Sequence, residues 1–257
     1  MSKQISNSNI KKKTYPAERS KFDFEVSLWV YYVTRPLSFS ITNIFLRLNI
    51  SANFTTVISF IIGIFSCCFF CYGDYSLTIV GAFLYNLFLV MDSVDGNIAR
   101  YNNQSSKKGT LLDALVGDLI NILILPSICL GLILHQNQYE LFDFIYIDRT
   151  MLLTFVFIAI ACNLFTSLFF QRKKIIFSDD TTKANSFFMK RSNLLYYFLF
   201  ILRNLYGFAF IAPAIIIFSI SNFMIILLLL LSLINVGVFL ATLTYAIYFI
   251  FVEKASQ

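Results

Sequence analysis

The sequence predicts an all-α integral membrane protein, and its composition and its hydropathy pattern both support this fold class. Of the 257 residues, 58% are hydrophobic and 13% are charged, against roughly 25% charged residues in a typical soluble domain. Mean hydropathy is +0.74. Apolar segments of about the 20 residues that a helix needs to cross a bilayer recur along the chain. They predict six transmembrane helices, at about 54–72, 75–91, 110–134, 150–170, 194–220 and 223–252.

A different kind of helix is predicted before the first span. Apolar and polar side chains alternate at helical spacing between positions 37 and 48, and Pro36 suits the first turn of a helix. The pattern predicts an amphipathic helix in the cytoplasmic interface of the membrane, with packing against a soluble partner as the alternative. Its apolar face comprises Leu37, Ile41, Ile44, Phe45 and Leu48, and its polar face comprises Ser38, Ser40, Thr42, Asn43 and Arg47.

The distribution of charge predicts the domain organisation and the orientation. Residues 1–36 read as a basic N-terminal arm without the apolar core of a signal peptide, and residues 37–257 as one membrane domain. Lysine and arginine gather in the arm, in the turn at 100–108 and in the segment 172–191, which all fall on one side of the membrane. Because basic loops favour the cytoplasm, we expect this side and both termini to be cytoplasmic.

Four aspartates surround the short turn between the second and third predicted spans. Asp92 and Asp95 close one helix, and Asp113 and Asp118 open the next. Residues three or four apart share a helix face, so the two carboxylate clusters meet at the mouth of a helical hairpin. Converging carboxylates repel one another in a low dielectric unless cations neutralise them. Ligands that are all oxygen favour Mg²⁺ or Mn²⁺ over Zn²⁺.

One pattern in this stretch resembles the signature of the CDP-alcohol phosphatidyltransferases: Asp92-x-x-Asp95-Gly96-x-x-Ala99-Arg100, then eight residues, then Gly109-x-x-x-Asp113. Seven specified positions match, which by chance at one start point would happen on the order of once in 10⁸. The six-span layout, the interfacial helix and the segment 50–56 extend the resemblance. In that segment Ala52 stands where the family usually has proline.

The resemblance implies an enzyme that transfers a phospho-alcohol group from a CDP-alcohol donor to an acceptor alcohol and releases CMP. It also implies two divalent cations, a homodimer and at least one lipid substrate, and no nucleic-acid partner is expected. The aspartates Asp92, Asp95 and Asp113 would hold the cations. The residues expected to bind the nucleotide are Asn53, Thr56, Gly96, Ala99, Arg100 and Gly109, and the candidates for the acceptor side are Asn121 and Arg203.

The chain departs from the family pattern at one position. The family has a fourth aspartate four residues after Asp113, but here Gly117 occupies that place and the carboxylate follows at Asp118. On a regular helix Asp118 lies about 140° around from Asp113, whereas position 117 lies about 40° around. We predict a π-bulge between Asp113 and Asp118, which would return Asp118 to the metal side as general base and fourth ligand. The alternative is a regular helix, with Asp113 or Asn121 near the attacking hydroxyl.

Two other functions are compatible with these residues. A catalytically impaired family member could keep nucleotide binding and act as a partner or regulator, and Gly117 motivates this reading. An ion transporter or channel could use the aspartates for ions, but transporter sites tend to lie near the membrane midplane, whereas these aspartates lie at one edge. The transferase is therefore the preferred interpretation.

Overall fold

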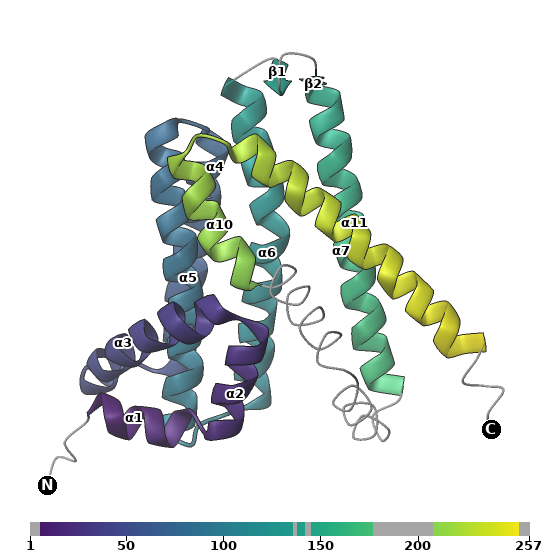
Figure 1. Cartoon of the computed structure of the whole chain (residues 1–257). Helices are drawn as coiled ribbons and strands as arrows, with labels where there is room; N and C mark the ends of the chain where they lie inside the picture. Colours follow the sequence, from purple (N-terminus) through teal and green to yellow (C-terminus); the bar gives the residue numbers. More distant parts are fainter. Residues whose placement is uncertain (1–5, 136–137, 142–144, 177–207, 252–257) are drawn as a thin grey trace, which may run out of the picture.

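The protein is a helical bundle in the computed structural model, which describes residues 6–135, 138–141, 145–176 and 208–251 (Figure 1). In the part of the chain that the structure describes, five helices are long and apolar enough to cross a membrane, as expected of an integral membrane protein. These five helices are α4 (Ala52–Tyr72), α5 (Tyr75–Tyr101), α6 (Lys107–His135), α7 (Arg149–Ile176) and α11 (Met224–Phe251).

The long helices agree with five of the six predicted spans. The remaining prediction, at 194–220, is described only from Phe208, where the apolar helix α10 (Phe208–Ile220) begins. Arg203 lies outside the described residues. A short antiparallel hairpin of β1 (Gln138–Leu141) and β2 (Ile145–Asp148) precedes α7, and the hydropathy pattern did not predict it.

Local signals set the turn between α4 and α5. Gly73 ends α4 with a φ of 77°, a left-handed conformation that glycine adopts without a steric penalty. The carboxylate of Asp74 then caps α5, because it accepts hydrogen bonds from the N–H groups of Ser76 at 3.0 Å and Leu77 at 3.3 Å. This short connection makes α4 and α5 antiparallel neighbours. The far end of α5 therefore returns to the level at which α4 begins.

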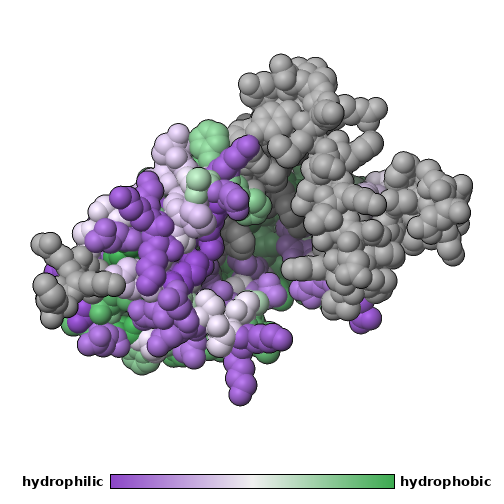
Figure 2. Space-filling view, turned by 90° about the horizontal axis from the view of Figure 1, so that it is seen from below, coloured by the Kyte–Doolittle hydropathy of each residue, from purple (hydrophilic) through white to green (hydrophobic). Residues whose placement is uncertain are grey.

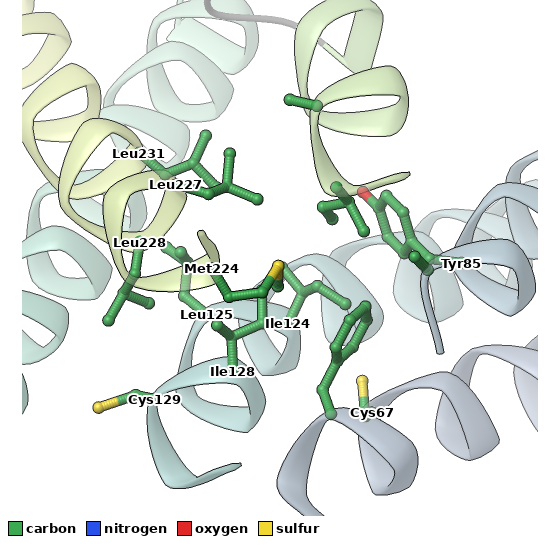
Figure 3. Packing of buried hydrophobic residues seen from close by; sticks show 14 of the residues in the cluster. Cys67, Tyr85, Ile124, Leu125, Ile128, Cys129, Met224, Leu227, Leu228 and Leu231 are labelled. Carbon is green, nitrogen blue, oxygen red and sulfur yellow. The ribbon is translucent and has the colours of Figure 1, made fainter. Parts of the chain in front are cut away.

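The main core lies where α4, α5, α6, α10 and α11 meet (Figure 3). Aliphatic residues of α6 and α11 interdigitate there, and Tyr85 of α5 is fully buried beside them. The labelled members of this core are Cys67, Tyr85, Ile124, Leu125, Ile128, Cys129, Met224, Leu227, Leu228 and Leu231. This packing holds together the end of the bundle that is remote from the aspartates. The aspartates and the other polar side chains of the motif lie at the opposite end.

The N-terminal region is folded onto that other end. It forms α1 (Asn7–Thr14), α2 (Ala17–Val26), a short π-helix η1 (Val30–Thr34) and α3 (Arg35–Arg47), which lie across the lower ends of α5 and α6 (Figure 1). A second apolar cluster holds them there, in which Ile10, Tyr15 and Phe39 pack with Val94 and Ile98 of α5. The basic arm expected from the sequence therefore contains helices that contact the motif-bearing helix.

Helix α3 occupies the predicted amphipathic segment, and two residues of the predicted polar face, Ser38 and Thr42, are buried. Ser38 and Thr42 are fully buried, and their hydroxyls accept hydrogen bonds from the Asn97 amide of α5, at 3.1 Å and 3.3 Å. Leu37 and Ile44, on the apolar face, are 51% and 55% exposed. An apolar face that is not covered by protein suits contact with lipid. The location of α3 in the membrane interface stays a prediction.

Two glycines allow a close backbone contact between the C-terminal end of α4 and helix α6. A Cβ built on Gly131 would lie 2.9 Å from the Cα of Gly73 and would collide with the carbonyl oxygen of Phe70. A Cβ built on Gly237 of α11 would meet nothing within 4 Å. We expect Gly131→Ala to destabilise the fold by about 1–3 kcal/mol, because backbone atoms cannot move aside as side chains do. Gly237→Ala should leave the thermal midpoint nearly unchanged. Equal midpoints for the two variants in detergent unfolding would contradict this packing.

Candidate active site

Helices α5 and α6 bring three of the four aspartates together at the end of the bundle that carries the N-terminal helices. The carboxyls of Asp92 and Asp113 lie within hydrogen-bonding reach of each other, and Asp95 is close enough for its charge to act on both. Asp95 is 3% exposed, and the other two are partly buried. The convergence follows from the hairpin, which places the last turns of α5 beside the first turns of α6. The role of these three aspartates as metal ligands stays a prediction.

Asp95 is held in place by α4. Its Oδ2 accepts a 2.6 Å hydrogen bond from the buried Thr56 hydroxyl, which also donates to the Ala52 carbonyl at 3.1 Å. Thr56, predicted to contact the nucleotide, thus orients a carboxylate in this structure. Nearby, a Cβ on Gly109 would lie 3.1 Å from Oδ1 of Asn53, so these two expected nucleotide residues face each other. Glycine at 109 keeps this gap between α4 and α6 free.

The arginine of the motif folds back along its own helix. A Cβ on Gly96 would lie 3.0 Å from both terminal nitrogens of Arg100, so the small residue makes room for this guanidinium. Nη2 of Arg100 donates to Oδ1 of Asn97 at 3.0 Å, and its buried Nε has no hydrogen-bond partner. Ala99, beside it, is partly buried. Glycine at 96 therefore has a structural reason in addition to the expected approach of a nucleotide.

Asn97 is a residue that the sequence reasoning missed. Its side chain is fully buried and joins Ser38 and Thr42 of α3 to Arg100 of α5. The only signal in the sequence was a polar residue on a helix between two small motif positions, next to the charged cluster. A buried amide with satisfied hydrogen bonds fixes the geometry of both helices.

A cavity of about 160 Å³ opens beside the aspartates. Its walls come from the π-helix, from the first residue of α3, from α5 and from α6, and they combine polar groups with apolar side chains. The lining residues are Val30, Thr34, Arg35, Phe88, Leu89, Asp92, Ser93, Gly117 and Asn121. Arg35 is the second residue that sequence reasoning missed, since it lies in the arm rather than in the motif. Position 117 faces the cavity as expected for a regular helix, and a Cβ there would meet nothing within 4 Å.

The predicted π-bulge in α6 is wrong. The helix is α-helical without interruption from Lys107 to His135, so Asp118 points to the exposed side and is not part of the cavity wall. Packing gives a physical reason: Val116, Ile120 and Ile124 are buried at four-residue spacing, and an inserted residue would rotate the later two out of the core. The π-helix that does occur, Val30–Thr34, borders the cavity from the N-terminal side.

The donor set fits a hard divalent cation by its chemistry. Asp92, Asp95 and Asp113 offer only oxygen, and two carboxyls in mutual contact need a cation or a proton between them. Within the described ranges, no three side chains of His, Cys, Asp or Glu are already arranged as a metal-binding group. These three aspartates are therefore the residues that would hold a cation, after small side-chain movements. Asp118 does not lie with them.

Comparison with known families identifies the chain. The family model of the CDP-alcohol phosphatidyltransferases matches residues 49–252. The chain belongs to this family. The family transfers phospho-alcohol groups from CDP-alcohols and generally depends on divalent cations. No curated protein matches the sequence. The match begins after α3, so the N-terminal helices, and Arg35 with them, lie outside the part that this family model covers.

The regular α6 helix predicts a small effect of removing the carboxylate at Asp118. Loss of a general base costs about 10²–10⁴-fold in rate, whereas we expect Asp118→Asn to change CMP release by less than about threefold. Asp113→Asn, one and a half turns earlier on the same helix, is the matched change and should abolish release. A drop of 10²-fold or more in Asp118→Asn with unchanged CDP binding would restore Asp118 as the base.

Proposed function

We propose that this protein transfers a phospho-alcohol group from a CDP-alcohol to an acceptor alcohol in phospholipid or related lipid-linked biosynthesis. The convergence of Asp92, Asp95 and Asp113 beside a cavity carries the proposal, together with membership of the family. In the reaction, the acceptor oxygen attacks the phosphorus that bears the donor's alcohol. The bond from this phosphorus to the oxygen bridging it to CMP breaks, and CMP leaves with the electron pair.

Bound divalent cations would neutralise the diphosphate and stabilise the leaving group. Side chains of the protein would position the nucleotide. Thr56 keeps Asp95 turned toward the shared site, and the gap between Asn53 and Gly109 lies on the α4 side of the aspartates. We assign the nucleotide to this side, with Arg100 near the phosphates. Arg100 is itself held by Asn97, so it needs little reordering when an anion binds.

The acceptor would enter the cavity on the other side of Asp92. Gly117 leaves space there that an aspartate would fill, and Asn121 offers its amide one turn further along α6. We assign the hydroxyl proton to the Asp92–Asp113 pair, which needs no fourth carboxylate. A catalytically impaired protein that binds nucleotide and serves as a partner is the second candidate function, and the glycine at 117 is the observation that favours it.

The remaining assignments concern the surroundings of the site. We propose that the site and both termini face the cytoplasm, that at least one substrate is a lipid, and that the protein is a homodimer. The end of the bundle with the N-terminal helices is largely hydrophilic over its described part, as expected of a face turned to water (Figure 2). The exposed apolar face of α3 supports a position at the lipid boundary, from which a lipid substrate could reach the site.

The proposal predicts strict dependence on a divalent cation. Asp92→Asn and Asp113→Asn should each abolish both CMP release and the Mg²⁺- or Mn²⁺-dependent binding of CDP, because each removes a charge that holds the cation. Arg172→Ala, at an exposed position of α7, should leave both intact. CMP release from CDP-alcohols by the purified protein is the measurement. Full turnover in excess chelator would rule out the metal, and metal-dependent CDP binding without any release would favour the impaired protein.

A further inference from the structure

Trp29, in the N-terminal region, is hydrogen-bonded to a membrane-spanning helix. Its indole Nε1 donates to Oδ1 of Asn86 on α5 at 3.0 Å. The amide nitrogen of Asn86 donates in turn to the carbonyl of Ala82 at 3.0 Å and to that of Ala212 on α10 at 2.9 Å. The indole also packs against the main core of the bundle. A single amide therefore joins the N-terminal region to both α5 and α10.

This contact sets the depth of Trp29 in the membrane. The apolar span of α5 is predicted to end at position 91, so Asp92 marks the level of the lipid headgroups. Asn86 precedes Asp92 by six residues, which is about 9 Å along the helix at 1.5 Å per residue. Segments that bind in the membrane interface insert about 5–10 Å into the boundary between headgroups and acyl chains. Trp29 therefore lies at the level of the acyl chains.

The chain around Trp29 has the composition of a membrane-inserted segment. No charged residue lies between Glu25 and Arg35. Tyr31 and Tyr32 follow the tryptophan closely within this uncharged stretch. Tryptophan and tyrosine are enriched where membrane proteins pass from the hydrocarbon to the headgroups, because their rings are apolar and carry one polar group. The stretch is too short to cross a bilayer, so it must enter and leave on the same side.

The hydrogen bonds of this segment suit a low dielectric. The N–H of Val30 donates to Oγ of Ser27 at 3.1 Å, and the N–H of Tyr31 donates to the Ser27 carbonyl at 3.0 Å. At its end, the N–H of Arg35 donates to the Val30 carbonyl, and the Arg35 side chain forms a buried ion pair with Asp23. Backbone groups and charges at membrane depth need partners within the protein. These groups have them.

Apolar side chains are exposed on the outer face of this turn. Leu28 is 38% exposed, Phe24 is 41% exposed and Tyr32 is 63% exposed. The rings of Phe24, Tyr31 and Tyr32 contact one another edge to face, with centroids 4.9 to 6.5 Å apart. An exposed aromatic cluster at the depth of Asn86 has acyl chains rather than water as its natural surroundings.

We propose that residues 27–34 form a re-entrant turn, inserted into the leaflet next to the aspartates, with its exposed aromatic face in contact with lipid acyl chains. The inference does not depend on the transferase reaction. It adds a membrane contact upstream of α3, whose own location in the interface is a separate prediction. Because Val30 and Thr34 also line the cavity, one wall of the candidate site belongs to this inserted turn.

Fluorescence quenching tests the depth directly, because Trp29 is the only tryptophan in the sequence. Purified protein is placed in phosphatidylcholine nanodiscs with or without lipid that is brominated near the middle of its acyl chains. Acrylamide, a quencher dissolved in water, is titrated separately. We expect the brominated lipid to lower the emission at least about twofold and acrylamide to lower it much less, since an inserted indole meets acyl chains. Tyr32→Trp in a Trp29→Phe background provides a more exposed probe of the same turn and should respond alike.

Two further probes in the Trp29→Phe background calibrate the measurement. Lys12→Trp, at an exposed position of α1, should be quenched by acrylamide and not by brominated lipid. Phe157→Trp, at a position of the spanning helix α7 that is 75% exposed, should be quenched by brominated lipid.

The two probes of the turn separate its possible surroundings. Stronger quenching of both by acrylamide than by brominated lipid would place the turn in water and overturn the proposal. Protection of both from both quenchers would show that protein covers the turn, either another segment of this chain or a second copy, and would overturn it as well. Protection of Trp29 alone, with the probe at position 32 quenched by lipid, would support the proposal, since the outer face of the turn then meets acyl chains.

Discussion

Three carboxylates are held close together at the end of the bundle that carries the N-terminal helices. Their mutual repulsion determines how this end of the protein is organised. Asp92, Asp95 and Asp113 meet because the short turn between α5 and α6 places the last turns of α5 beside the first turns of α6. Such a cluster persists only if each charge has a partner. Thr56 supplies a hydrogen bond to Asp95, Arg100 and Arg19 lie close enough to Asp113 for their charges to act on it, and Arg35 does the same for Asp92. A divalent cation would complete this neutralisation, so the constraint that shapes the fold also defines the chemistry.

The N-terminal helices are part of the site. They are tied to the motif helix α5 by the buried amide of Asn97, and they deliver Arg35 to the cavity through a π-turn. The Asp23–Arg35 pair is buried, and such pairs add little stability but break at high cost, so it acts mainly to fix a position. The family model matches residues 49–252, so these helices lie outside the part of the chain that it covers.

Hydropathy and motif spacing predicted the long helices, the family and the meeting of the aspartates, because these depend on local pattern and on one short turn. They could not predict Arg35 or Asn97, since both act through contacts between segments far apart in the sequence. The predicted bulge in α6 was wrong because Ile120 and Ile124 are buried in the core and require a regular helix, and this packing cannot be seen from the spacing of the aspartates. A helix over the segment 37–48 was predicted, but the burial of Ser38 and Thr42 against Asn97 could not be, since it depends on a contact with a distant part of the chain.

The most direct test of the central claim is an electron paramagnetic resonance titration of the purified protein in nanodiscs with Mn²⁺, without any substrate. The account predicts tight binding of Mn²⁺ as a spin-coupled pair, lost in Asp95→Asn and unaffected in Asp148→Asn, which alters an exposed aspartate at the opposite end of the bundle (Figure 1). No tight Mn²⁺ binding, or equal binding by both variants, would contradict the claim that the three aspartates form a cation site.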